Sequence, residues 1–207
     1  MRIGIIGAGH IGGTAARLFA RAGHPVAVSN SRAPTTLALL ASSIGPNAKA
    51  MTPAEAVTFG EAVLLALPWR KKQDLPSAEL FAGKIVIDAM NPYAATGRVM
   101  DLGASTSSEE VAKQLPGARL VKAFNTMGWN TLASGGRPAH EERLVVFIAG
   151  DDADAKATVA TLIDGIGFAT LDTGSLRDGG RRQQPGTPIY GRPLTVREAQ
   201  AILSRRP

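Results

Sequence analysis

The first twelve residues place a short apolar stretch directly before a glycine-rich turn. Residues 3–6 are apolar apart from Gly4, the sequence Gly-Ala-Gly-His-Ile-Gly follows at residues 7–12, and Ala15, Ala16 and Phe19 then recur at helical spacing. A strand, a G-x-G-x-x-G turn and a helix in this order are typical of a dinucleotide-binding βα unit. A glycine-rich βα turn with no ligand is the alternative interpretation.

Each glycine of this turn has a separate physical reason. Gly7 allows the chain to leave the strand in a tight turn, and Gly9 removes a side chain that would block a pyrophosphate. Gly12 allows the helix to pack closely against the strand. The pyrophosphate would then lie over free backbone N–H groups at the positive end of the helix dipole.

The end of the second apolar stretch indicates which nicotinamide cofactor binds. Residues 24–28 form this stretch, and Asn30, Ser31 and Arg32 follow it. NAD-binding proteins usually carry an acidic residue here for the ribose hydroxyls, whereas this segment has no carboxylate. Ser31 offers a hydroxyl donor, and the Arg32 guanidinium can bind a phosphate with two hydrogen bonds. We therefore predict the 2′-phosphate of NADP here; a polar turn with a surface arginine is the alternative.

Composition indicates an ordinary globular protein. The 207 residues are 44% hydrophobic and 19% charged, which is enough for one substantial core. The net charge is +6, but the basic residues are dispersed, apart from short clusters at 70–72, 181–182 and 205–206. Only 5% of the residues are aromatic. We therefore expect the charge to attract anionic cofactors and predict no nucleic-acid partner.

Several chemistries are excluded by missing residues. The chain has no cysteine, so it forms no disulfide and has no thiolate metal site or cysteine nucleophile. Its histidines (His10, His24 and His140) have no neighbours that complete a metal site, and we predict none. No segment reaches the ~18 apolar residues of a membrane helix, and the N-terminal stretch is too short for a signal peptide. We expect a soluble, cytoplasmic protein without a membrane partner.

Strand and helix signals alternate along the chain, which predicts an α/β fold of the Rossmann type with a doubly wound, mainly parallel sheet. Residues 1–173 would form the NADP-binding domain, and residues 174–207 a small C-terminal arm and short helix. Beyond the first two strands, we predict further strands near residues 48–51, 62–67, 84–88, 120–124, 144–150 and 169–172. Helices are predicted near residues 35–42, after residues 151–154 and from residue 195. Two more helices are predicted by capping-box signatures at residues 52–55 and 107–110, in which Thr52 and Ser107 would be the N-caps.

Polar and special residues gather where the predicted strands end, which is where open α/β sheets bind ligands. Prolines and asparagines also end strands for conformational reasons alone. The sequence has no Tyr-x-x-x-Lys pair, since neither Tyr93 nor Tyr190 has a lysine four residues later. Hydride chemistry without an evident proton donor suits a reaction between two cofactors, in which positioning lowers the barrier. We therefore predict no catalytic side chain.

From residue 1 to about residue 173 the sequence resembles the NADPH-dependent coenzyme F420 reductases (F420:NADP oxidoreductases). The glycine turn and Asn-Ser-Arg at 30–32 contribute to this resemblance, as do Leu-Pro-Trp at 67–69 and Asp-Ala-Met-Asn-Pro at 88–92. The most specific stretch is Leu-Pro-Gly-Ala-Arg-Leu-Val-Lys-Ala-Phe-Asn-Thr at 115–126. The resemblance implies a Rossmann domain that moves a hydride directly between a nicotinamide and a deazaflavin ring stacked on it.

The resemblance also assigns site residues by position. The pyrophosphate would be held by Gly7, Gly9, His10, Ile11 and Gly12, and the 2′-phosphate by Ser31 and Arg32. The stretch from adenosine to nicotinamide would be flanked by Leu67, Pro68 and Trp69. The ring-stacking cleft would be bordered by Asn91, Asn125, Thr126 and Met127. The implied cofactors are NADP and coenzyme F420.

The second substrate and the C-terminal arm leave alternatives open. The same N-terminal architecture serves the ferric-reductase domains of membrane metalloreductases, which use a flavin. An NADPH-dependent reductase of a flavin, ferric chelate, imine or small carbonyl is therefore one alternative, and a non-catalytic NADP(H) sensor is another. We expect a homodimer. The arm could cover the cleft or exchange between the two subunits. Its arginines could meet the acidic tail of coenzyme F420.

Overall fold

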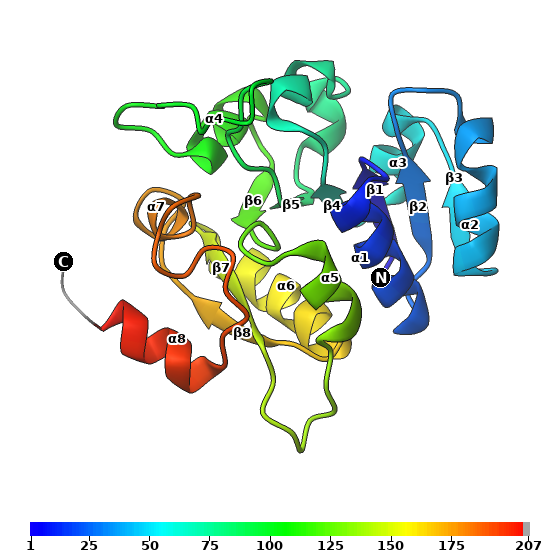
Figure 1. The fold of residues 1–207 in the computed structure, drawn as a ribbon. Helices are drawn as coiled ribbons and strands as arrows, with labels where there is room; N and C mark the ends of the chain where they lie inside the picture. The colour runs from blue at the N-terminus through cyan, green and yellow to red at the C-terminus, as the bar shows by residue number, and fades with distance from the viewer. Residues whose placement is uncertain (205–207) are drawn as a thin grey trace.

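A computed structural model describes residues 1–204 of the chain. All eight described strands lie in one sheet, in the order β3-β2-β1-β4-β5-β6-β7-β8 (Figure 1). The strands are β1 (Ile3–Ile6), β2 (Val26–Ser29), β3 (Ala48–Ala50), β4 (Ala62–Leu65), β5 (Ile85–Asp88), β6 (Arg119–Lys122), β7 (Val145–Gly150) and β8 (Ala169–Asp172). Every one of them corresponds to a predicted strand.

Strand order reverses between β1 and β4, which lie side by side although β2 and β3 separate them in sequence. Neighbouring strands are parallel except for the pair β6 and β7, which is antiparallel. The fold class predicted from the sequence is therefore confirmed: a doubly wound, mainly parallel α/β sheet of the Rossmann type. In such sheets the reversal point marks the ligand crevice.

Helices cover both faces of the sheet (Figure 1). The α-helices are α1 (His10–Arg21), α2 (Ala38–Ile44), α3 (Pro53–Phe59), α4 (Ser107–Gln114), α5 (Trp129–Ser134), α6 (Ala153–Gly165), α7 (Asp178–Arg182) and α8 (Val196–Leu203). Three 3₁₀ helices are η1 (Pro34–Leu37), η2 (Trp69–Asp74) and η3 (Ala78–Phe81). The sequence patterns did not predict α5, α7, η2 or η3, because segments of four to six residues are too short to show a helical period.

Capping side chains decide where several helices begin. Thr52 accepts a hydrogen bond from the backbone N–H of Glu55, so the capping box predicted there forms. Thr195 forms a further capping box with Glu198, which the sequence analysis did not single out. For α4 the predicted position is one residue late. Thr106, rather than Ser107, is the N-cap, because its hydroxyl accepts the N–H of Glu109.

Two apolar clusters fill the space between the sheet and its helices. The four residues of β4 are fully buried, as expected for a central parallel strand covered on both faces. One cluster packs α1 and α6 against one face of the sheet, with Phe19 and Phe124 in edge-to-face contact. The other packs α3 and α4 against the opposite face around Phe81 and Trp69.

The C-terminal segment forms a third cluster with the far end of the sheet. Ile189, Leu194 and Ala199 pack against Val145 and Phe147 of β7. In Figure 1 this segment, coloured orange to red, runs from α7 to α8 beside β7 and β8. The predicted boundary at residue 173 stays a prediction, and the basic pair at 205–206 lies outside the described residues.

Within residues 1–204, no helix is long and apolar enough to cross a lipid bilayer. The same residues contain no group of three or more His, Cys, Asp or Glu side chains that could hold a metal ion.

Candidate functional site

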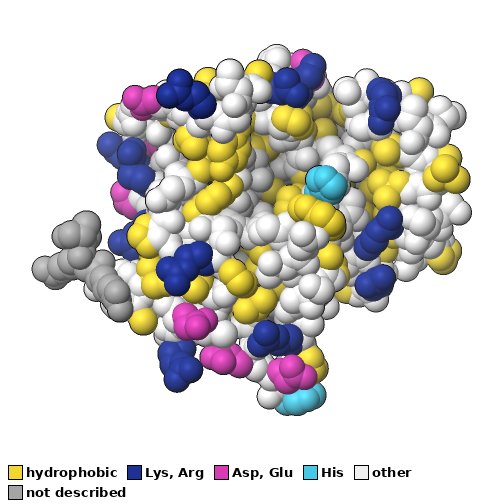
Figure 2. All heavy atoms as spheres, viewed as in Figure 1, with side chains coloured by type: hydrophobic (Ala, Val, Ile, Leu, Met, Phe, Trp, Pro, Cys, Tyr) yellow, Lys and Arg dark blue, Asp and Glu magenta, His cyan; other side chains and the backbone are white. Residues whose placement is uncertain are grey.

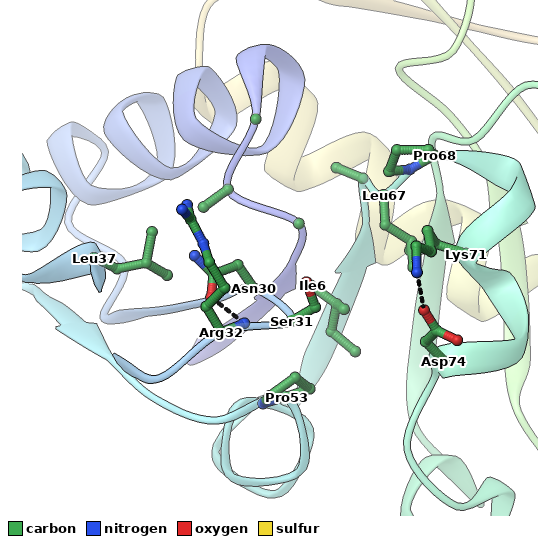
Figure 3. Close-up of a pocket in the computed structure, with 14 residues that line it drawn as sticks. Ile6, Asn30, Ser31, Arg32, Leu37, Pro53, Leu67, Pro68, Lys71 and Asp74 are labelled. Atoms are coloured by element: carbon green, nitrogen blue, oxygen red, sulfur yellow. Dashed lines mark hydrogen bonds and ion pairs between the residues drawn. The ribbon is translucent and has the colours of Figure 1, made fainter. Parts of the chain in front are cut away.

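A cavity of about 320 Å³ opens where β1, β2 and β4 end. These are the strands on both sides of the reversal in strand order, so the cavity occupies the expected ligand crevice. Figure 3 shows side chains from three directions around it: the segment after β2, the segment after β4, and the glycine turn between them. Its lining includes Gly7, Ala8, Gly9, Asn30, Ser31, Arg32, Leu37, Pro53, Leu67, Pro68, Lys71 and Asp74.

The glycine turn has the geometry that its sequence predicts. Gly7 has a φ of +101°, in the left-handed region that glycine tolerates best. A Cβ atom at Gly12 would overlap the carbonyl oxygen of Gly7, so α1 packs too closely on the turn for any side chain there. A Cβ atom at Gly9 would have no other atom within 4 Å, so this position faces open space in the cavity wall. The turn therefore fits a pyrophosphate passing over Gly9.

Helix α1 directs its N-terminus at the turn. Gly9 is the N-cap and provides no side-chain cap, so first-turn N–H groups remain available to an anion. His10, the first residue of α1, stacks on Trp129 of α5 with ring centroids 4.7 Å apart and planes 17° apart. Trp129 is 42% exposed. The sequence did not indicate this aromatic pair, because its members are 119 positions apart.

Arg32 is positioned through its backbone. Its N–H donates to Asn30 Oδ1 at 2.8 Å, and Asn30 Nδ2 donates to Thr36 Oγ1 at 3.1 Å. These bonds shape the turn after β2 and leave Ser31 and Arg32 lining the cavity (Figure 3). Among residues 1–204, no acidic side chain forms an ion pair with Arg32.

The opposite wall contains a pair that the sequence did not predict. Lys71 Nζ and Asp74 Oδ2 are 2.9 Å apart on η2, facing the Arg32 side of the cavity (Figure 3). The sequence has no carboxylate close to Arg32, but the folded cavity includes the carboxylate of Asp74. Lys71 pairs with Asp74. Among the described residues that line the cavity, Arg32 is therefore the basic residue without an acidic partner.

The other predicted residues divide between the cavity and the core. Leu67 and Pro68 line the cavity, whereas Trp69 is 4% exposed and packs into the apolar cluster beneath η2. Asn91, after β5, donates from Nδ2 to the backbone oxygen of Asn125 at 2.9 Å. Asn125 Nδ2 in turn donates to Asn91 Oδ1 at 3.1 Å. Thr126 and Met127 follow and are buried. The predicted contacts of all these residues, and of His10 and Ile11, with a cofactor stay predictions.

A buried ion pair holds β5 and β6 together below these asparagines. Lys122 Nζ lies 3.1 Å from Asp88 Oδ2, and both side chains are at most 1% exposed. Lys122 also donates to the Met90 carbonyl oxygen, and Asp88 accepts from Ser108 Oγ at 2.7 Å. Burial lowers the pKa of Lys122, and the Asp88 carboxylate opposes this shift. The sequence did not single out this network, because its members come from separate segments.

The fold, together with similarity to known proteins, defines the class of protein: an NADP-dependent oxidoreductase with a Rossmann fold. The family model of coenzyme F420-dependent NADP oxidoreductases matches residues 2–92. A hypothetical protein of Sinorhizobium meliloti is 34% identical, with a TM-score of 0.83 over 94% of this chain and 95% of that one. The chain belongs to the family of coenzyme F420-dependent NADP oxidoreductases, whose members bind NADP(H).

Two further similarities carry functional names. A proposed F420-dependent NADP reductase of Arthrobacter sp. FB24 is 29% identical, with a TM-score of 0.75 over 85% of this chain and 86% of that one. The metalloreductase STEAP3 of Rattus norvegicus is 32% identical over 176 residues, which are 84% of this chain. This chain spans only 34% of the length of that metalloreductase.

Proposed function

We propose that the protein transfers a hydride between NADP(H) and a second redox cofactor, the deazaflavin coenzyme F420. The observation that carries the NADP part is the cavity itself. Its floor is the open turn at Gly9, which suits a pyrophosphate. Its wall carries Ser31 and Arg32, which suit a 2′-phosphate, and Arg32 has no ion-pair partner within residues 1–204.

The position of this cavity supports one path for the bound cofactor and one location for hydride transfer. The adenosine side of NADP(H) would lie against Arg32 after β2, with the pyrophosphate over the glycine turn. The nicotinamide would then extend past Leu67 and Pro68, which follow β4, towards the end of β5. There Asn91 and Asn125 border the region in which a second ring could stack on the nicotinamide.

Coenzyme F420 as the partner is supported by the family and by the Arthrobacter relative, a proposed F420-dependent NADP reductase. We expect the visible absorbance of oxidised coenzyme F420 to disappear when the purified protein and NADPH are added. Replacing NADPH by NADH should slow this reaction strongly. No turnover in either direction between pH 5 and pH 9 would contradict the choice of coenzyme F420.

A ferric or flavin acceptor is the second candidate, since a metalloreductase matches 84% of this chain. The same NADPH oxidation assay, run with a flavin and with a ferric chelate, separates the candidates. Turnover with these acceptors but not with coenzyme F420 would favour the second. Tight NADPH binding without turnover of any acceptor would indicate a non-catalytic sensor.

A further inference from the structure

The two tyrosines of the chain meet at the edge of the sheet where the parallel strands end, which we call the ligand edge. Tyr93 follows β5, whereas Tyr190 belongs to the C-terminal segment, yet their hydroxyl oxygens are 3.1 Å apart. Asn91 Nδ2 donates to Tyr190 Oη at 3.1 Å as well as to the backbone oxygen of Asn125. The Tyr190 hydroxyl therefore lies beside the ends of β5 and β6, where the proposed function places the reacting rings.

Tyr190 is held in this position by the segment that carries it. The Gly191 N–H donates to the Thr126 carbonyl oxygen at 2.8 Å, and Asn125 Nδ2 donates to the Gln183 carbonyl oxygen at 2.7 Å. Ile189, directly before Tyr190, is 1% exposed in the third apolar cluster. The segment is thus part of the ligand edge.

A count of donors shows that one phenolic proton has no partner within residues 1–204. Tyr190 Oη accepts one hydrogen bond from Asn91 Nδ2 and one from Tyr93 Oη. No described group accepts a hydrogen bond from the Tyr190 hydroxyl. Tyr190 is only partly buried, so this proton can meet a ligand.

The surroundings of Tyr190 suit a group that keeps its proton until it is needed. Burial raises the pKa of the Tyr190 hydroxyl. The phenol is therefore protonated at neutral pH. Once the proton has left, the N–H of Asn91 and the O–H of Tyr93 already point at the oxygen that would carry the charge.

We propose that Tyr190 is the catalytic acid that protonates the hydride acceptor. This inference rests on the proposed function, with NADPH as the hydride donor. The hydride adds to a carbon of the acceptor, and the electron pair of the broken π bond moves to a conjugated nitrogen or oxygen atom. That atom takes the proton of Tyr190, NADP⁺ leaves, and a proton from water restores the phenol. NADPH is oxidised and the acceptor gains one hydride and one proton.

This chemistry defines a class of acceptor. A deazaflavin ring, an imine and a small carbonyl compound each need a proton on nitrogen or oxygen when hydride adds to carbon. A ferric chelate takes single electrons and needs no such proton. The assay therefore includes coenzyme F420, an imine and a small aldehyde as separate acceptors.

The test compares Tyr190→Phe with Tyr93→Phe in the full chain. Tyr190→Phe should lower kcat about 100-fold, the usual contribution of a positioned general acid, and leave the Kd for NADPH unchanged. Its residual rate should rise with the concentration of a small buffer acid, because the proton must then come from solution. Tyr93→Phe should lower kcat by less than about tenfold, because the donating proton of Tyr190 remains.

The outcomes separate the inference from the function on which it rests. Wild-type kcat in Tyr190→Phe would overturn the inference and leave the proposed function standing. A residual rate that does not respond to buffer acid, together with a lower melting temperature, would make the hydroxyl pair structural and also overturn it. If the wild type oxidises NADPH with none of the acceptors, the proposed function fails first and the inference fails with it.

Discussion

At the scale of single residues, Arg32 and Lys122 are basic side chains in opposite environments. Arg32 is exposed in the cavity, with its position set by the turn at Asn30 and no carboxylate paired to it within the described residues. Lys122 is fully buried, and every donor it uses points at Asp88, Ser107 or the backbone of Met90. The first is accessible from the cavity, and the second joins β5 and β6 within the core.

Replacing Arg32 by alanine should weaken the binding of NADPH about ten- to a hundredfold and leave that of NADH nearly unchanged. A charged contact to phosphate contributes about 1.5–3 kcal/mol, and only NADPH has the 2′-phosphate. Isothermal titration calorimetry with both nucleotides measures the difference. Arg197→Ala, an exposed arginine on α8, is the matched control. Equal losses for the two nucleotides would contradict the assignment.

Replacing Lys122 by methionine should lower the free energy of unfolding by about 3–5 kcal/mol, since the buried Asp88 side chain would lose its cationic partner. Urea denaturation measures this loss. The control is Lys113→Met on α4, whose exposed pair with Glu110 should contribute less than about 1 kcal/mol. Similar losses of unfolding free energy in both variants would show that the buried Lys122–Asp88 pair contributes no more than an exposed pair.

At the scale of elements, charged caps connect helices to strands. Asp152 is the N-cap of α6, where Oδ1 accepts the N–H of Ala155 at 2.9 Å. The same carboxylate accepts two hydrogen bonds from Arg119, the first residue of β6, at 2.6 and 2.9 Å. One side chain therefore starts a helix and attaches it to a strand.

This double role makes α6 sensitive to acid. The hydrogen bonds from Arg119, followed by that from Ala155, lower the pKa of Asp152 well below its ordinary value of 3.8. The carboxylate therefore adds stability above about pH 4, and the protein loses that contribution as pH falls towards the lowered value. The melting temperature of Asp152→Asn should lie below that of the wild type at pH 7, and the difference should shrink steadily as the pH falls below about 4. A difference that stays constant with pH would contradict this account.

At the scale of the whole molecule, the C-terminal segment completes both the core and the ligand edge. Its apolar residues cover Val145 and Phe147, and its tyrosine reaches the end of β5. Basic side chains are scattered over the face in Figure 2 and do not form one patch, which suits small anionic ligands better than nucleic acid. Absence of nucleic-acid binding, like the expected homodimer, stays a prediction.

A chain that ends at Thr173 should be markedly less stable than the full chain, because the face of β7 that carries Val145 and Phe147 would be exposed. Loss of several buried apolar side chains should lower the melting temperature by at least roughly 5 °C. Differential scanning calorimetry measures this change. In the full chain, Leu194→Asp should have a similar effect and the exposed Arg197→Asp almost none. An unchanged melting temperature after truncation would support an independent domain at 1–173.

Local signals were sufficient for the eight strands, for the capping box at Thr52, and for the conformation of the glycine turn. Each depends on side chains within a few positions of one another, so a short window contains the physical cause. The one-residue error at Thr106 arose because Thr106 and Ser107 are both N-cap residue types and each is followed three positions later by a glutamate. Trp69 shows the limit, since its neighbours suggest a strand end near a ligand whereas its ring packs into the core.

By itself the sequence determined the alternation of strands and helices and the turn at Gly7, since these follow from backbone sterics and local hydrogen bonding. It also showed directly that the segment after β2 is basic and has no acidic residue. Only the tertiary structure decided that Lys71 and Asp74 face Arg32, that Lys122 neutralises Asp88, and that Tyr190 reaches Tyr93 and Asn91. These contacts join segments far apart in sequence, and they form because the sheet brings its strand ends to one edge and the C-terminal segment folds back over it.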